Sequence, residues 1–180
     1  YQFNSGTKQG GHQVQRYTDF VRSKLKIDTK PSRLCVYRNN SVSFKESSFD
    51  SNKLILGLNP GASYGSAKQW YPRGFASVAV QLSTKYDIII FGGQNEINVA
   101  NEIESILKKN KIINYKNFAG KTDISQLINH ISTIDLFITG DSGPMHIAAA
   151  FQVPTVAIFG PTKHQETSQW MNEKSLIVKK

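Results

Sequence analysis

The sequence has a single cysteine, Cys35, and no long apolar run. One cysteine excludes an internal disulfide and a thiolate metal cluster, and we expect Cys35 to be a small buried residue of a strand in RLCVY. No segment approaches the ~18 consecutive apolar residues that a membrane-spanning helix needs, and the first residues lack the apolar middle of a signal peptide. These absences predict a soluble cytoplasmic domain.

Acidic residues are also scarce, since 13 Asp and Glu stand against 22 Lys and Arg and give a net charge of +9. Residues 1 to 53 carry +6 of this charge, without a tight basic run interleaved with aromatic residues. Two interpretations stay open: a solvated lysine-rich surface, which we favour, and attraction to an anionic membrane face or ligand. We expect no nucleic-acid partner.

The 180 residues, 39% of them hydrophobic, suit one globular domain whose pattern changes near residue 53. Residues 12–25 carry an apolar side chain every three or four positions, which predicts an amphipathic helix. Residues 39–52 are rich in Ser and Asn and read as a linker. The apolar positions of the predicted helix are Val14, Tyr17, Val21 and Leu25.

After residue 53, short apolar runs alternate with segments of helical periodicity. The runs are LILGL (54–58), DIIIF (87–91), LFIT (136–139) and TVAIF (155–159), and the helical segments are GFASVAVQLSTKY, NEINVANEIESILKK and ISQLINHIS. Continuous apolar runs are typical of strands that are covered on both faces. The pattern predicts an α/β fold, a Rossmann-like parallel sheet with helices on both faces, in which ligands bind beyond the carboxyl ends of the strands.

The first two loops at that edge contain two candidate ligand-binding residues. Lys68 is the cation of a glycine-bearing loop, NPGASYGSAKQWYPRG, whose spacing fits no Walker loop. A loop lysine is usually only solvated, and the residues leave its role open. Glu96 opens a helix after Gly92 and Gly93, where a carboxylate either favours the helix dipole or accepts ribose hydroxyl groups.

The stretch TGDSGPMHIAAA (139–150) predicts a helix that starts at the same edge. Pro144 suits the first helical position, and free backbone N–H groups there form an anion site for which a diphosphate is the natural occupant. Ser142 adds a hydroxyl donor. Asp141 makes a poor divalent site alone, which leaves capping or sugar binding, and His146 is either a packed side chain or a donor to the ligand.

A fourth loop, GPTKHQETSQW, follows the last predicted strand and places Thr162, Lys163 and His164 near the expected ligand. The carboxyl ends of parallel strands share one edge of a sheet, so four glycine-bearing loops are expected to converge there. This convergence predicts one ligand site.

Four motifs together resemble the bacterial heptosyltransferases of glycosyltransferase family 9: PGASYGSAKQW, FAGKTD, DSGPMHIAAA and VPTVAIFGPT. The resemblance implies a GT-B fold, of which this chain is the C-terminal, nucleotide-sugar-binding domain. Residues 1–52 would be the end of the missing N-terminal domain plus the interdomain linker, and residues 53–180 the Rossmann-like domain. The resemblance places the general base in the missing half, so no catalytic base is assigned here.

The resemblance also implies a reaction, the transfer of heptose from ADP-L-glycero-D-manno-heptose to the lipopolysaccharide inner core, with no cofactor and no essential metal. It implies the following roles: Lys68 stabilises the leaving diphosphate, Glu96 binds the ribose, Lys121 and Thr122 border adenine, Asp141 lies near the sugar, and Ser142, Gly143, Pro144 and His146 hold the phosphates.

Besides a nucleic-acid-binding domain, which the expected absence of a nucleic-acid partner disfavours, two alternative functions stay open. In the first, the chain is a nucleotide-sugar-binding fragment without turnover. In the second, it belongs to another GT-B enzyme such as a sugar-nucleotide epimerase. The implied acceptor and the basic charge together predict a peripheral contact with the cytoplasmic face of the inner membrane.

Overall fold

The structure is a computed structural model that describes residues 11–38, 49, 52–61 and 69–179. Its helices are α1 (Gln13–Leu25), α2 (Pro72–Leu82), α3 (Ile97–Lys109), α4 (Ile124–Ile131), α5 (Gly143–Ala150) and α6 (His164–Thr167), with a short 3-10 turn, η2 (Gln94–Glu96), before α3. Its strands are β1 (Leu54–Asn59), β2 (Tyr86–Ile90), β3 (Tyr115–Asn117), β4 (Leu136–Gly140), β5 (Thr155–Phe159) and β6 (Ser175–Lys179).

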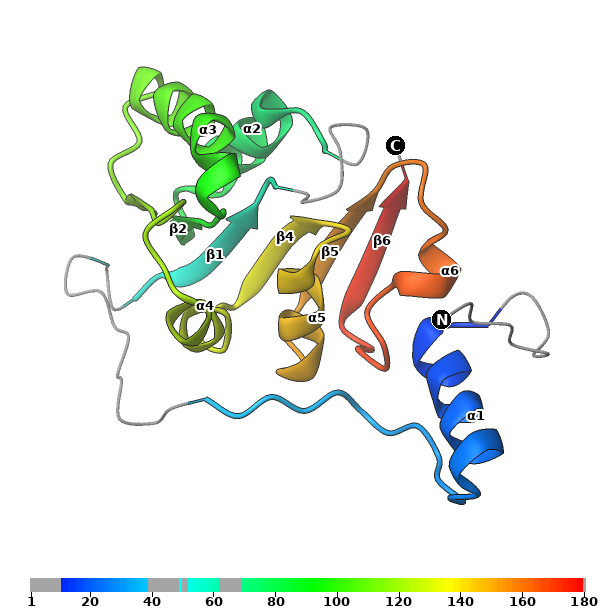
Figure 1. The fold of residues 1–180 in the computed structure, drawn as a ribbon. Helices are drawn as coiled ribbons and strands as arrows, with labels where there is room; N and C mark the ends of the chain where they lie inside the picture. Colours follow the sequence, from blue (N-terminus) through cyan, green and yellow to red (C-terminus); the bar gives the residue numbers. More distant parts are fainter. Residues whose placement is uncertain (1–10, 39–48, 50–51, 62–68, 180) are drawn as a thin grey trace.

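The strands form one parallel sheet in the order β3-β2-β1-β4-β5-β6 (Figure 1). The four apolar runs of the sequence are its four central strands, so the predicted α/β parallel sheet is confirmed. The two edge strands were not predicted, because β3 has three half-buried residues and β6 leaves three of its five residues exposed. The chain reverses its direction of travel across the sheet between β1 and β4, which is the switch point where doubly wound sheets bind ligands.

Helices cover both faces of the sheet because successive strand residues point to opposite sides. On one face, Leu56 and Leu58 pack with Ile88 and Ile90 beneath α2 and α3. On the other face, Phe137 packs with residues of α4 and α5. The two layers appear on either side of the sheet in Figure 1. The predicted helices on both faces are therefore confirmed.

Gly57 in the middle of β1 allows the second face to pack closely. A Cβ atom at this position would lie 2.6 Å from Ile134 Cδ1 and 2.8 Å from Phe137 Cδ2, well inside van der Waals contact. The apolar side chains of neighbouring elements therefore occupy the space that a side chain at Gly57 would need.

The predicted N-terminal helix is confirmed as α1, but it buries none of its side chains. It is attached through polar contacts at the β6 side of the sheet, where His12 Nε2 lies 2.9 Å from the carbonyl oxygen of Ser168. Farther along the chain, Trp170 Nε1 donates to the carbonyl oxygen of Ser32 at 3.0 Å. An ion pair between Arg16 and Glu166 spans 3.7 Å.

The prediction of a buried Cys35 in a strand is wrong. Cys35 is exposed, and residues 26–38 have no regular secondary structure. Leu34 and Val36 are half-buried while the residues between and after them face solvent, and the described sheet provides no partner strand beside them. Apart from Phe49 and Asn52, the predicted linker 39–52 lies outside the described residues.

Candidate functional site

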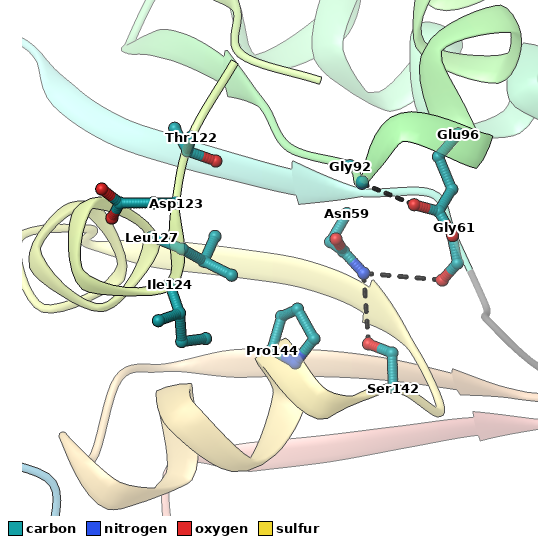
Figure 2. A pocket seen from close by; sticks show the side chains of 11 residues that line it. Asn59, Gly61, Gly92, Glu96, Thr122, Asp123, Ile124, Leu127, Ser142 and Pro144 are labelled. Atoms are coloured by element: carbon teal, nitrogen blue, oxygen red, sulfur yellow. Dashed lines mark hydrogen bonds between the residues drawn. The ribbon is translucent and has the colours of Figure 1, made fainter. Parts of the chain in front are cut away.

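A pocket of about 290 Å³ lies at the carboxyl edge of the sheet, beyond the ends of the paired strands β1 and β4 (Figure 2). We call it the rim pocket. The loops that follow β1, β2, β3 and β4 all contribute to it, and the α4 and α5 helices begin beside it. Its lining residues are Asn59, Gly61, Gly92, Gly93, Glu96, Thr122, Asp123, Ile124, Leu127, Ser142 and Pro144.

Asn59 ends β1 and connects it to the loop after β4. Its side chain is only 4% exposed. Its amide nitrogen donates to Ser142 Oγ at 3.1 Å and to Thr139 Oγ1 at 3.2 Å, with a longer contact of 3.5 Å to the Gly61 carbonyl oxygen. Thr139 Oγ1 also lies 3.1 Å from Ser142 Oγ and 3.1 Å from the Gly140 carbonyl oxygen.

The direction of these hydrogen bonds follows from the available protons. Thr139 uses its hydroxyl proton on the Gly140 carbonyl, so its oxygen accepts from Asn59. Ser142 Oγ likewise accepts from Asn59, which leaves the Ser142 hydroxyl proton for Thr139 or for a ligand. Asn59 therefore fixes where the Ser142 oxygen lies at the pocket.

The start of α5 lies beside the rim with the backbone N–H of Gly143, because Pro144 has no N–H group and the Met145 N–H donates to the Ser142 carbonyl oxygen at 3.1 Å. Ser142 is the N-cap residue, but its side chain makes no capping bond to its own helix because it is held by Asn59 and Thr139. Pro144, expected at the first helical position, is the second residue of α5, after Gly143. A Cβ atom on Gly143 would meet nothing within 4 Å, so this surface is open to a ligand. Helix starts of this kind bind anions in many proteins.

Glu96 lines the pocket and also has a structural role there. One of its carboxylate oxygens accepts a hydrogen bond from the Gly93 backbone N–H. Three glycines make room for its side chain, and a Cβ atom on Gly61 would lie 2.4 Å from Glu96 Cγ. Gly92 and Gly93 would also crowd this side chain if they carried a Cβ atom. These glycines therefore let the backbone of two loops lie close to the Glu96 side chain.

The opposite wall of the rim pocket comes from the chain between β3 and α4. Thr122 lies there beside Ile124 and Leu127, as Figure 2 shows. The Asp123 carboxylate accepts from the Gln126 backbone N–H at 2.7 Å and so caps α4. The wall therefore offers two apolar side chains, and its carboxylate is engaged by the helix.

The other predicted site residues that the structure describes do not line the pocket. Lys121 is exposed and donates to the Asn117 carbonyl oxygen at 3.0 Å, next to a different groove. Thr162 lies in the loop after β5, and its buried Oγ1 has no hydrogen-bond partner in the part of the chain that is described. Asp141 and His146 are half-buried beside the start of α5.

The pKa of His146 lies below its usual value, chiefly because burial disfavours the charged imidazolium. The charge of His12 acts in the same direction, and the Asp141 carboxylate acts against both. His146 is therefore neutral near pH 7, a form that suits either a packed side chain or a donor to a ligand.

Lys68, the predicted diphosphate ligand, lies outside the described residues. Within the described ranges, no group of three or more His, Cys, Asp or Glu side chains is arranged to hold a metal ion. Glu96, Thr122, Ser142 and Pro144 are the predicted site residues that the rim pocket brings together.

Sequence reasoning missed several residues of the pocket. Asn59 immediately follows the predicted first strand. It is a hydrogen-bonding side chain at the edge of the sheet where a ligand is expected. Asp123 and Gln126 form a capping box, which is a recognisable signal for the helix that carries Leu127. Ile124 has no such signal, because its place at the pocket depends on how the α4 start meets α5.

The sheet order defines a doubly wound α/β protein. Its rim pocket lies at the switch point, where such sheets bind ligands. The model of glycosyltransferase family 9 (heptosyltransferase) matches residues 1–180. The chain therefore belongs to glycosyltransferase family 9, and the resemblance seen in its motifs is confirmed.

The relatives agree with this assignment. The chain is 44% identical over 184 residues to a lipooligosaccharide heptosyltransferase 2 of Campylobacter jejuni, covering 99% of this chain and 56% of the relative. It is 32% identical to the lipopolysaccharide heptosyltransferase 2 of Escherichia coli over 76% of this chain and 40% of that protein. The chain thus spans about half the length of the curated relatives that it matches most fully.

A solved structure of E. coli ADP-heptose lps heptosyltransferase II is 32% identical, with a TM-score of 0.68 over 73% of this chain and 40% of that one. A glycosyltransferase family 9 structure from Veillonella parvula has a TM-score of 0.80 over 97% of this chain and 50% of that chain, at 20% identity, and supports the fold alone. In the described part of the chain, no helix is long and apolar enough to cross a membrane.

Proposed function

We propose that this chain binds ADP-L-glycero-D-manno-heptose in the rim pocket and serves as the nucleotide-sugar-binding half of a heptosyltransferase that acts on the lipopolysaccharide inner core. The observation that carries the proposal is the position of the pocket, at the β1/β4 switch point against the exposed start of α5, in a chain of family 9. Relatives named lipooligosaccharide or lipopolysaccharide heptosyltransferase 2 support the choice of acceptor.

The diphosphate is proposed to lie at the start of α5. The backbone N–H of Gly143 and the Ser142 hydroxyl donate to it, and the positive end of the helix dipole favours its charge. Charge on the ADP leaving group grows as the glycosidic bond breaks, so donors already held in place stabilise the transition state. We propose that Lys68 and His146 also contact the diphosphate. Asp141 and Thr162 are proposed to lie near the sugar.

The nucleoside is proposed to lie along the rest of the pocket. Ile124 and Leu127 provide an apolar wall for adenine, with the backbone at Lys121 and Thr122 along its edge. The Glu96 carboxylate, oriented by the Gly93 N–H, accepts hydrogen bonds from the ribose hydroxyl groups. The proposed donor site requires no metal ion.

A second candidate function is binding without turnover by the chain alone. It is favoured by the length of the chain, which is about half that of the relatives. We propose that residues 53–180 form the C-terminal domain of a GT-B enzyme, that residues 1–52 complete the preceding domain and the linker, and that the general base belongs to that preceding domain.

We also propose that the enzyme works in the cytoplasm at the inner membrane. The names of the relatives describe a saccharide acceptor that carries lipid, and a lipid-bearing acceptor is held at a membrane surface. The net charge of +9 favours an anionic surface of this kind.

Titration calorimetry of the chain with ADP and UDP tests the donor site. We expect ADP to bind and UDP to bind at least about tenfold more weakly, and Ser142→Ala to weaken ADP by about tenfold, the loss of one hydrogen bond to a charged group. A chain that prefers UDP would favour the epimerase alternative, and one that binds neither would contradict the proposal. A transfer assay on the same chain separates binding from turnover.

A further inference from the structure

A second concave surface lies at the β3 edge of the sheet, away from the rim pocket. It is a groove of about 620 Å³ between the end of α3 and β3, and we call it the lysine groove. Its lining residues are Glu104, Lys108, Lys111, Ile112, Ile113, Tyr115, Lys116, Asn117, Phe118 and Lys121. Four of its ten lining residues are therefore lysines, and one is acidic.

The charge of the C-terminal two thirds of the chain is concentrated here. Residues 104–121 contain five lysines and one glutamate, a net charge of +4, whereas the rest of residues 54–180 has a net charge of −1. The net charge of residues 54–180 as a whole is only +3, which conceals this concentration. The groove is thus a local centre of positive potential.

The single carboxylate of the groove, Glu104, is engaged by three neighbouring side chains. Glu104 forms an ion pair of 2.8 Å with Lys108 and accepts from Asn117 Nδ2 at 2.7 Å and from the Tyr115 hydroxyl at 3.2 Å. The hydrogen bond from Lys108 is the main reason why the pKa of Glu104 lies below its usual value. Lys111 and Lys121 remain exposed at the rim of the groove.

An apolar side chain stands among these charges. Ile113 is 91% exposed, although its neighbour Ile112 packs against the core. The chain reaches this position by a turn after α3 in which Lys111 has a left-handed backbone conformation, with φ 60°. Lysines around a protruding isoleucine match the surface of an anionic bilayer, which offers phosphate groups to the charges and acyl chains to the apolar tip.

The aromatic residues of the groove do not suit a nucleic-acid site. Single-stranded nucleic acid stacks its bases on exposed aromatic rings. Here Tyr115 is half-buried and bonded to Glu104, and the ring of Phe118 packs on His130 with centroids 4.7 Å apart. The groove thus offers charge and an aliphatic tip, which favours lipid.

We propose that the lysine groove and Ile113 dock the protein on anionic phospholipid headgroups of a membrane. This inference builds on the proposed function, since it names the surface that meets the membrane carrying the acceptor. Lys121 lines the groove and the next residue, Thr122, lines the rim pocket, so docking here would hold the donor site close to the membrane surface.

Co-sedimentation with vesicles tests the proposal. The vesicles contain phosphatidylglycerol and phosphatidylcholine in roughly equal amounts, or phosphatidylcholine alone. We expect the chain to bind only the anionic vesicles, in a salt-sensitive manner. Lys108→Gln with Lys111→Gln should weaken binding about 30-fold, about fivefold per charge, and Ile113→Asn about tenfold.

Matched controls come from α1 and the first residues after it, at the opposite edge of the sheet (Figure 1). Lys24→Gln with Lys30→Gln removes the same charge from exposed positions, and Leu25→Asn removes a side chain that is 63% exposed. We expect these variants to bind vesicles like the unchanged chain.

Three outcomes would overturn the assignment: no binding to anionic vesicles, equal losses in the groove and control variants, or displacement of the chain from vesicles by a DNA oligonucleotide. Calorimetry with ADP on the same groove variants keeps the donor site separate. Intact ADP binding with lost vesicle binding supports the proposal, and lost ADP binding in the unchanged chain would count against the proposed function alone.

Discussion

Replacement of Asn59 by leucine tests how the rim pocket positions its anion donor. Leucine has the branched shape of asparagine but is larger and provides no N–H group, so the bonds from Asn59 to Ser142 and Thr139, at 3.1 and 3.2 Å, are lost. At a net value of about 1 kcal/mol for each bond, we expect the free energy of unfolding to fall by about 1–2 kcal/mol. A domain of ordinary stability survives this loss.

The effect on ligand binding is expected to pass through Ser142. Without its donor from Asn59, the Ser142 hydroxyl is free to rotate and to turn its proton away from the diphosphate. Loss of this one charge-assisted hydrogen bond, the same bond that Ser142→Ala removes, would cost about 1.4 kcal/mol and weaken ADP binding about tenfold.

A double-mutant cycle measured by calorimetry decides whether Asn59 acts in this way. We expect Asn59→Leu and Ser142→Ala each to weaken ADP about tenfold, and the double variant also by about tenfold rather than about a hundredfold. Thr139→Val, which leaves the bond between Asn59 and Ser142 in place, should change ADP affinity less than about threefold. Independent, multiplicative losses would refute the argument, as would unchanged ADP affinity in a folded Asn59→Leu variant.

Three further predictions concern packing, protonation and the leaving group. Gly57→Ala should lower the free energy of unfolding by about 1–3 kcal/mol in urea denaturation, because its Cβ atom would overlap the core, whereas Gly143→Ala, in open space, should change it by less than about 0.5 kcal/mol. Because the pKa of His146 is lowered in the folded chain, the unfolded chain binds a proton at this residue more readily, and the free energy of unfolding should fall as pH drops below the usual value of 6.5. His146→Gln should flatten this dependence on pH. An equally steep dependence in His146→Gln would contradict the assignment. Lys68→Ala should slow heptose transfer by the complete enzyme roughly a hundredfold, and an unchanged rate would remove Lys68 from the mechanism.

The central strands could be predicted from the sequence because they are buried on both faces. Burial on both faces requires a continuous apolar run, and the helical periodicity between these runs implies a parallel sheet. The edge strands β3 and β6 carry no such signal, since each has one strand neighbour and contains no fully buried residue. Cys35 was misjudged for a related reason, because an alternating apolar segment predicts a strand only when a partner strand lies beside it.

The candidate site was only partly accessible to sequence reasoning. Ser142 and Pro144 were found because the start of a helix after a strand has a local signature. Asn59 was not, because its role depends on a neighbour 83 residues away in the chain. The lysine groove was hidden for a similar reason, since its charge was averaged over 127 residues instead of being placed on one edge of the sheet.

The sequence by itself determined the fold class, the family and the edge of the sheet at which a ligand is expected, because periodicity and short motifs are local properties of the chain. The tertiary structure alone decided which loops share a pocket, that Asn59 holds the Ser142 hydroxyl, and that four lysines and one exposed isoleucine meet at the β3 edge. These are contacts between residues distant in sequence or on adjoining elements, and they depend on strand order and on how each helix packs, which no local pattern contains.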